Sequence, residues 1–346
     1  MMEEYAKPAL LRLLADYGVD DFSELRAIDS SHGEDDLRWN YILDRRWVLR
    51  INSAPVMTEQ RLAELAPLIE RCRAFGVRAP RFLRGTDGRY LRRDGGRFVY
   101  LSEYLDEKTA DELLAARPEL RPALCDRRLE LVARYAECYR GEPLTETRSM
   151  YSLFDLSPYD APTGIDEKQA NADELAGALR ALGETALAER LLAESDRIRA
   201  ALLPHWHALP QATFQGDESF GNLCVDDTGK ITGVFDFNMS GTDVCANYLA
   251  NLAFQGRFYY TDDAFESRDA DRLCAQVLRS FRDATALIAR HYRFTPAEHA
   301  AYFLCARLVM LFGYVNMAAF CLYLEQERYR GECLRLLRLL LDAELE

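Results

Sequence analysis

The residues best able to do chemistry together are two carboxylates and an amide: Asp217, Asp236 and Asn222. Asp217 lies five residues before Asn222, and a segment with the pattern of a β-hairpin separates Asn222 from Asp236. The hairpin is predicted because two apolar, β-branched runs, 223–225 and 231–235, flank a cluster of turn residues. Residues that flank the two strands of an antiparallel hairpin become neighbours, with Cα atoms roughly 5 Å apart. Oxygen ligands gathered at one end of a hairpin suit a hard divalent cation.

The order Gly-Asp-x4-Asn, hairpin, Asp-Phe matches the kinase catalytic loop and its metal-binding motif. The chain resembles the aminoglycoside phosphotransferase and choline kinase-like family, whose signature is His-Gly-Asp-x4-Asn, a hairpin and Ile-Asp-Phe. Here the motif reads Gln215-Gly216-Asp217-x4-Asn222 and then Phe235-Asp236-Phe237. The resemblance implies an α+β, protein-kinase-like bilobal fold with a small antiparallel-sheet N-terminal lobe and a larger, mostly helical C-terminal lobe. We expect the nucleotide-binding lobe in residues 1–103 and the catalytic and acceptor-binding lobe in residues 104–346.

The resemblance also implies an enzyme, a kinase that uses ATP (or GTP) and Mg²⁺ to phosphorylate a hydroxyl group of a small molecule. Asp217 then orients the acceptor hydroxyl and takes its proton, while Asn222 and Asp236 hold the magnesium ions. Gln215 stands where the family has a His that braces the loop. Because a glutamine amide both donates and accepts hydrogen bonds, we expect the bracing to persist.

The N-terminal third has the pattern of a small sheet with one helix after its third strand. We predict a helix over 4–17, then strands over 25–28, 37–43 and 47–51, a helix over 58–75, and strands over 81–83 and 97–104. This is the order of elements expected of a kinase-like N-terminal lobe.

The third strand of such a lobe carries a cation that holds the α- and β-phosphates and pairs with a helix glutamate. The chain has no lysine between Lys7 and Lys108, so the role is assigned to Arg50. The planar guanidinium can bind phosphate oxygens bidentately. We choose Glu64 as its partner, with Glu59, near the helix start, as the alternative.

The segment 102–105 is predicted to be the hinge, where the backbone of Glu103 and Leu105 offers an acceptor and a donor to adenine. The loop over 30–36 has one glycine and three adjacent acids, which departs from a glycine-rich phosphate loop. From residue 108 onward the pattern is helical almost throughout, with a break near 183, a helix over 243–254, and further breaks near 261–263 and 294–296.

The composition narrows the class of partner. The net charge of −13 argues against nucleic acid and anionic membranes as partners and favours a cationic small-molecule acceptor, although a solubilising surface explains the charge equally well. The nine cysteines are scattered singly and the first residues lack the profile of a signal peptide, which indicates a cytoplasmic protein. The apolar run 308–324 is shorter than a membrane span and is predicted to be a buried helix. Nothing in the sequence indicates an oligomeric state.

A nucleotide-binding pseudokinase is the alternative function. Arg50, Gln215 and the acidic loop favour it, whereas the intact Asp217, Asn222 and Asp236 favour catalysis. The acceptor stays open among aminoglycosides, macrolides, choline-like amines, homoserine and sugars. Glu218 and Asp243 are candidate pocket acids that favour a cation.

Overall fold

The structure, a computed structural model, describes residues 5–31, 36–53, 57–160, 164–255 and 260–345. The chain divides into two compact units, each made of two stretches of sequence. The first unit comprises Met1–Leu120 and Gln215–Ser240, and the second comprises Arg121–Phe214 and Gly241–Glu346. The predicted catalytic, cofactor-binding and metal-binding residues all belong to the first unit. The predicted lobe boundary between residues 103 and 104 divides the chain differently and stays a prediction.

A five-stranded antiparallel sheet of order β1-β2-β3-β5-β4 forms the N-terminal part of the first unit. Its strands are β1 (Leu25–Asp29), β2 (Arg38–Leu43), β3 (Trp47–Asn52), β4 (Arg92–Asp94) and β5 (Arg97–Glu103). The strand predicted at 81–83 is wrong. That segment makes an isolated bridge from Phe82 to Ser102, and the fifth strand is instead β4, which a Gly95-Gly96 turn joins to β5. Both glycines have positive φ, a conformation that glycine adopts without steric cost.

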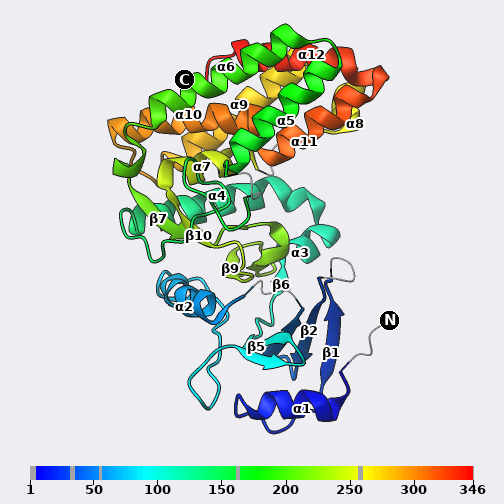
Figure 1. Cartoon of the computed structure of the whole chain (residues 1–346), viewed down its shortest axis with the longest axis vertical. Coiled ribbons are helices and arrows are strands. Elements are labelled where there is room, and N and C mark those ends of the chain that lie inside the picture. Colours follow the sequence, from blue (N-terminus) through cyan, green and yellow to red (C-terminus); the bar gives the residue numbers. More distant parts are fainter. Residues whose placement is uncertain (1–4, 32–35, 54–56, 161–163, 256–259, 346) are drawn as a thin grey trace. The chain divides into compact units, whose positions relative to one another are not determined.

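One face of this sheet packs against helix α1 (Lys7–Ala15), as Figure 1 shows. Because side chains alternate along a strand, Tyr41, Leu49 and Leu101, which are paired across β2, β3 and β5, share this face. They are fully buried in one cluster with Leu10 and Leu14 of α1. The other face of the sheet is thereby left to line a pocket.

Helix α2 (Glu59–Ala74) begins where the Thr58 side chain accepts a hydrogen bond from the backbone N–H of Arg61 at 3.1 Å. Its apolar stripe is buried: Leu62, Leu65, Leu68, Ile69 and Cys72. This helix agrees with the one predicted over 58–75.

The rest of the first unit carries the predicted hairpin. Strands β8 (Leu223–Val225) and β9 (Ile231–Val234) pair antiparallel, and β6 (Lys108–Thr109) adds a third strand beside β8. Helix α3 (Ala110–Ala116) follows β6, and a capping box between Thr109 and Glu112 caps its N-terminus. The hairpin prediction is confirmed.

The second unit is mainly helical, as predicted (Figure 1). Its helices are α4 (Arg121–Cys138), α5 (Glu167–Ala181), α6 (Thr185–Leu202), α7 (Cys245–Phe254), α8 (Asp262–Glu266), α9 (Ala270–Ile288), α10 (Pro296–Phe312), α11 (Tyr314–Glu325) and α12 (Glu327–Asp342). Two short strands were not predicted: β7 (Gln211–Phe214) pairs antiparallel with β10 (Gly241–Val244). The helix predicted from residue 243 therefore begins two residues later, at Cys245, because Asp243 and Val244 pair with β7.

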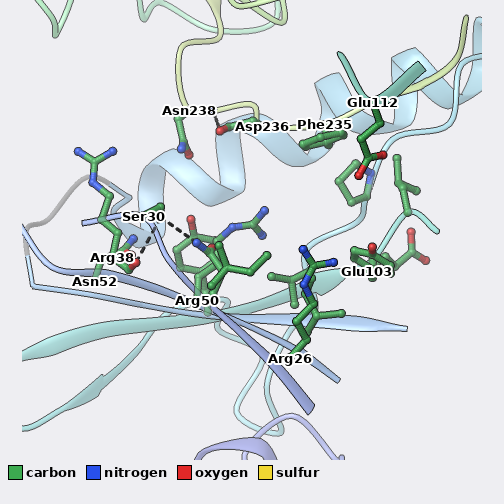
Figure 2. A pocket seen from close by; sticks show the side chains of 18 residues that line it. Arg26, Ser30, Arg38, Arg50, Asn52, Glu103, Glu112, Phe235, Asp236 and Asn238 are labelled. Atoms are coloured by element: carbon green, nitrogen blue, oxygen red, sulfur yellow. Dashed lines mark hydrogen bonds between the residues drawn. The ribbon is translucent and has the colours of Figure 1, made fainter. Parts of the chain in front are cut away.

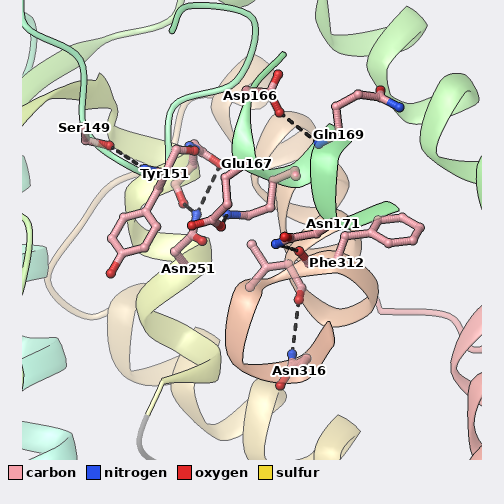
Figure 3. A network of polar contacts seen from close by, with 12 residues as sticks. Ser149, Tyr151, Asp166, Glu167, Gln169, Asn171, Asn251, Phe312 and Asn316 are labelled. Atoms are coloured by element: carbon pink, nitrogen blue, oxygen red, sulfur yellow. Dashed lines mark hydrogen bonds and ion pairs between the residues drawn. The ribbon is translucent and has the colours of Figure 1, made fainter. Parts of the chain in front are cut away.

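Within the described residues, Pro296–Glu325 is the segment long and apolar enough to cross a membrane. Its most apolar stretch is 56% buried inside the structure. The helix breaks at Gly313, where buried carbonyl groups at the end of α10 need partners. Two amides donate to carbonyls there. Asn171 donates to the Phe312 carbonyl at 2.8 Å (Figure 3), and Asn316 donates to the Met310 carbonyl at 3.3 Å and, at 3.1 Å, to that of Val309, which also accepts from the Gly313 N–H.

Candidate active site

The side chain of Gln215 holds the loop that carries Asp217. Its Nε2 donates to the backbone carbonyls of Phe235 at 2.9 Å and Asp236 at 2.6 Å, and its Oε1 accepts from the backbone N–H of Asp217 at 2.8 Å. Gln215 is 5% exposed, so these hydrogen bonds are sheltered from water. The glutamine thus makes the bracing contacts that we expected at this position.

Gly216 lets the loop approach the segment after Asp236 closely. Its φ is +97°, and a Cβ atom at this position would lie 2.1 Å from the carbonyl oxygen of Met239. Only glycine fits there, both for its backbone angle and for lack of space. Ser240 completes the contact by donating from Oγ to the carbonyl of Gln215 at 2.7 Å.

Asp217 and Asn222 are in direct contact. Nδ2 of Asn222 donates to Oδ2 of Asp217 at 2.8 Å and to the Asp217 carbonyl at 3.1 Å. The backbone N–H of Ser219 reaches Oδ1 of Asp217 at 3.3 Å. Because the amide nitrogen of Asn222 is used in this way, its Oδ1 is the atom available as a ligand.

Asp236 has a strained backbone. Its φ is +58°, in the left-handed region that costs roughly 1–2 kcal/mol for a residue with a Cβ atom. The N–H of Phe235 donates to the carbonyl of Asn222 at 3.1 Å, which continues the hairpin ladder up to Asp236. Strain of this kind clusters at functional sites, so the angle marks Asp236 as a candidate.

The side chains of Asn222 and Asp236 offer oxygens of the kind that magnesium takes as ligands. Mg²⁺ takes oxygen ligands and is commonly held by one or two protein carboxylates together with phosphates and water. In the described part of the chain, no group of three or more His, Cys, Asp or Glu side chains is placed to hold a metal ion by itself. The metal-binding roles of Asn222 and Asp236 remain predictions.

A pocket of about 430 Å³ lies over the face of the sheet opposite α1 (Figure 2). One row of paired residues, Ile28, Asn40, Arg50 and Tyr100, crosses β1, β2, β3 and β5 along its wall. The remaining lining residues are Arg26, Ser30, Arg38, Ile42, Val48, Asn52, Pro80, Glu103, Tyr104, Leu105, Glu112, Phe235, Asp236 and Asn238. The pocket therefore brings together four predicted site residues: Arg50, Glu103, Leu105 and Asp236.

Arg50 lies on this wall with its guanidinium near two side chains of β5. Nη1 donates to Oγ of Ser102 at 2.7 Å, and the guanidinium carbon lies 5.7 Å from the centre of the Tyr100 ring. Burial raises the pKa of Tyr100, with Arg50 lowering it and Asp236 raising it. The neutral phenol therefore lies within electrostatic range of both predicted site residues.

The two glutamates proposed as partners of Arg50 are in contact with other residues. Glu64 accepts a hydrogen bond from Gln60 at 2.9 Å and lies 3.6 Å from Nη1 of Arg61. Glu59 accepts from the backbone N–H groups of Tyr90 and Leu91, at 3.0 Å and 2.8 Å. The pairing of Arg50 with Glu64 stays a prediction.

The predicted hinge is held by contacts on both sides. The Glu103 side chain accepts hydrogen bonds from Arg73 at 3.0 Å and from the backbone N–H of Arg81 at 3.1 Å. The Tyr104 N–H donates to the carbonyl of Arg46 at 2.8 Å. Among the described residues, the carbonyl of Glu103 accepts a long hydrogen bond from Ser102 at 3.3 Å, which leaves it suited to a stronger donor. It remains a prediction that the Glu103 carbonyl accepts a hydrogen bond from adenine and that the Leu105 N–H donates one to it.

Sequence reasoning missed several pocket residues. Arg26 and Arg38 add two guanidiniums to the pocket wall, although Asp36 neutralises Arg38 through hydrogen bonds of 3.0 Å and 2.7 Å. The alternation along β1, β2 and β3 could have placed these side chains on the same face as Arg50. Of the acidic loop over 30–36, residues 32–35 lie outside the described residues.

The two candidate pocket acids are buried. Glu218 is 6% exposed and Asp243 is 1% exposed. Asp243 accepts hydrogen bonds from Ser149 at 2.5 Å and Asn247 at 3.0 Å, and burial raises its pKa to about 6. The Asp243 carboxyl therefore belongs to a buried hydrogen-bond network inside the second unit.

A sequence model of the phosphotransferase enzyme family matches residues 30–291, which is most of the chain. No curated protein sequence matches it.

Solved structures of other proteins, among them the following two, match almost the whole chain at low sequence identity. Spectinomycin phosphotransferase, APH(9)-Ia, in complex with ADP and spectinomycin, has a TM-score of 0.51 and 10% identity over 97% of this chain and 94% of that one. The GDP and kanamycin complex of APH(2″)-IIIa has a TM-score of 0.50 and 12% identity over 94% and 95%. These likenesses show the fold and confirm the predicted class: α+β, kinase-like, with an antiparallel sheet in the N-terminal part and helices in the C-terminal part.

Proposed function

The chain belongs to the phosphotransferase enzyme family, and from this premise we propose that it uses ATP or GTP with Mg²⁺ to phosphorylate a hydroxyl group of a small molecule. Membership of the family confirms the predicted resemblance and the class of enzyme, a small-molecule kinase. The cofactor, the metal and the roles of individual residues are the proposal.

The observation that carries the proposal is the shared location of the predicted groups in one compact unit. The 430 Å³ pocket is lined by Arg50 at its wall, by the hinge at Glu103 and Leu105, and by Asp236. A nucleotide in this pocket would have its base beside the hinge and its phosphates beside Arg50 and Asp236. The structural neighbours described above hold ADP or GDP, which supports a nucleotide as the ligand.

Asp217 is the proposed catalytic residue. The acceptor hydroxyl oxygen forms a bond to the γ-phosphorus, the bond between that phosphorus and the β,γ-bridging oxygen breaks, and the hydroxyl proton passes to the Asp217 carboxylate. The products are the phosphorylated acceptor and the nucleoside diphosphate. The hydrogen bond from Asn222 at 2.8 Å holds one oxygen of Asp217 and aims the carboxylate.

The binding groups of the chain neutralise the phosphate charge. Asn222 and Asp236 would hold Mg²⁺, which when bound offsets the charge of the β- and γ-phosphates. Arg50 binds the α- and β-phosphates through its guanidinium fork. Because phosphoryl transfer depends mainly on positioning and charge stabilisation, these contacts and the brace of Gln215 are the main contributions of the chain.

The acceptor is proposed to be a small hydroxylated molecule, with a cationic one favoured by the net charge of −13. Spectinomycin and kanamycin are bound by the two structural neighbours, and aminoglycosides accordingly come first among the compounds to test. Neither nucleic acid nor a membrane is proposed as a partner. All nine cysteines are free, which supports the proposed cytoplasmic location.

A pseudokinase is the second candidate, because Arg50 and Gln215 replace the usual lysine and histidine. The braced Asp217 and the contacts of Gln215 favour catalysis over this alternative. Detectable nucleotide binding without hydrolysis or transfer to any acceptor would establish the pseudokinase instead.

The experiment is a mass-spectrometric screen of candidate acceptors with ATP or GTP and Mg²⁺. The expected product is heavier than its acceptor by about 80 Da, one phosphoryl group replacing a hydrogen. It should be absent with Asp217→Asn and present with Asp227→Asn, a matched change in the hairpin turn, where the Asp227 side chain is 87% exposed. Equal product from both variants would refute the assignment of Asp217.

A further inference from the structure

The side chain of Arg61 connects helix α2 to the backbone that follows Asp236. Its Nη2 donates to the carbonyl oxygens of Ser240 and of Asn238, the latter at 3.5 Å. Its Nη1 lies 3.6 Å from Oε2 of Glu64 on the same helix. The Arg61 side chain is only 11% exposed, so these contacts are made with little water between the groups.

The backbone that Arg61 holds is also in contact with the catalytic loop. The Oγ of Ser240 donates to the Gln215 carbonyl, and Gly216 passes so close to the Met239 carbonyl that no larger residue fits. Residues 238–240 therefore lie between Arg61 and the loop that carries Asp217. At its other end the segment joins Asp236, and the Asn238 N–H reaches Oδ1 of Asp236 at 3.4 Å.

We infer that Arg61 is a positioning residue for phosphoryl transfer. It sets residues 238–240 against the catalytic loop, and so fixes the position of Asp236 relative to Asp217. Arg61 is not among the residues that line the pocket, so it acts through these two acids and not on the nucleotide itself. The inference rests on the proposed function, since it assumes that Asp217 and Asp236 act on one reaction centre.

Arginine suits this position for a geometric reason. Its planar group presents several N–H donors in a fixed fork, so Nη2 alone can donate to two backbone carbonyls while the positive charge stays beside the Glu64 carboxylate. A lysine ammonium keeps the charge beside Glu64 but lacks the fork, and it should hold the segment less firmly. A glutamine removes the charge and shortens the reach.

The test compares Arg61→Gln and Arg61→Lys with the wild type and with Glu70→Gln. Glu70 lies on the same helix, and its carboxylate pairs with Arg81 at the surface, where the two side chains are 54% and 48% exposed. The control therefore removes a charged contact from α2 without touching residues 238–240. The measurements are kcat, KM for the nucleotide, the Mg²⁺ concentration that gives half the maximal rate, and amide hydrogen exchange of residues 236–240.

Arg61→Gln should lower kcat by about 10- to 100-fold, the loss expected when reacting groups are misplaced by about 1 Å. It should raise the Mg²⁺ requirement and speed amide exchange in 236–240, while KM for the nucleotide changes less than kcat. Arg61→Lys should recover part of the rate. Glu70→Gln should match the wild type in kcat, Mg²⁺ requirement and amide exchange. The inference is overturned if Arg61→Gln matches the wild type in all three as well.

Two further comparisons keep the result interpretable. If Arg61→Gln does not fold, Arg61→Lys carries the test, and wild-type kcat and exchange in that variant overturn the inference. Asp217→Asn and Asp236→Asn test the proposed function separately. If Asp217→Asn and Asp236→Asn still transfer phosphate, the assumed reaction centre is wrong. If both lose transfer but the Arg61 variants keep the wild-type kcat, only the positioning role of Arg61 is rejected.

Discussion

Arg50 donates a hydrogen bond from Nη1 to Oγ of Ser102 at 2.7 Å, across neighbouring strands β3 and β5. Ser102 is fully buried, and its hydroxyl lies 3.3 Å from the carbonyl of Glu103. One small side chain thus connects the residue proposed for the phosphates with the one proposed for the base. The serine leaves space for the guanidinium and gives it an acceptor, which helps to explain how arginine can serve where kinases carry lysine.

Replacing Arg50 should weaken nucleotide binding. A hydrogen bond to a charged group contributes about 1.5–3 kcal/mol, so Arg50→Met should raise the nucleotide Kd about 10- to 100-fold, as measured by isothermal titration calorimetry. Ser102→Ala should have a smaller effect, and the two effects should not add in the double variant. Arg12→Met is the matched control, because Arg12 lies on α1 with its side chain 67% exposed. An unchanged Kd in Arg50→Met would place the phosphates elsewhere.

Asp217→Asn should abolish most of the turnover and leave nucleotide binding largely intact. Loss of a general base typically costs about 10²- to 10⁴-fold in rate. The asparagine keeps an oxygen that can accept the hydrogen bond from Asn222, so the loop should retain its conformation. Initial rates with a responsive acceptor measure the loss, and a kcat within a few-fold of the wild type would contradict the role.

Gln215→Ala should reduce both stability and kcat. The change removes the donor that reaches the part-buried carbonyls of Phe235 and Asp236 at 2.9 Å and 2.6 Å, and each lost hydrogen bond should cost about 0.5–1.5 kcal/mol. Thermal unfolding and kcat are the measurements. Gln215→His, which restores the residue usual in the family signature, should lose less of both. Equal losses in the two variants would show that the brace does not depend on hydrogen bonding.

The elements that could be predicted from the sequence are those that depend on residues close together in the chain. The hairpin at 223–234 follows from two apolar runs around a turn, and the helices follow from apolar periodicity and from breaks such as Gly183. The contact between Asp217 and Asn222 has a local cause too, since the two residues are five apart on one loop before the hairpin. Arg50 is predicted from the lack of a lysine near the third strand, and it lines the pocket together with Asp236, whereas the roles of both residues stay predictions.

The elements that could not be predicted from the sequence depend on contacts between residues far apart in the chain. The pairing of β7 with β10 joins two four-residue strands on either side of the catalytic loop and hairpin, and neither strand is long enough to show a period. The contact of Arg61 with Asn238 spans 177 residues. Phe82 makes a bridge to Ser102 without forming a strand, so its apolar neighbours misled the prediction of the fifth strand.

The buried carboxyl of Asp243 should make the stability of the chain depend on pH. Burial raises its pKa in the folded state from 3.8 to about 6, against the lowering effect of hydrogen bonds from Ser149 and Asn247 and of the charge of Lys168. Between about pH 4 and pH 6 the folded state therefore binds more protons than the unfolded state, and this group reduces stability as the pH rises through that range. A pKa difference of about 2 corresponds to roughly 3 kcal/mol.

Asp243→Asn removes this titration. The free energy of unfolding of the variant, relative to the wild type, should therefore increase between pH 4 and pH 7, by up to the same roughly 3 kcal/mol. Urea unfolding followed by circular dichroism at several pH values in this range measures the difference. Asp227→Asn, at an exposed position in the hairpin turn, should show no such trend. The prediction is contradicted if the difference in the free energy of unfolding between Asp243→Asn and the wild type stays constant from pH 4 to pH 7. Asp243 would then have an ordinary pKa in the folded state, because Ser149, Asn247 and Lys168 offset the effect of burial completely.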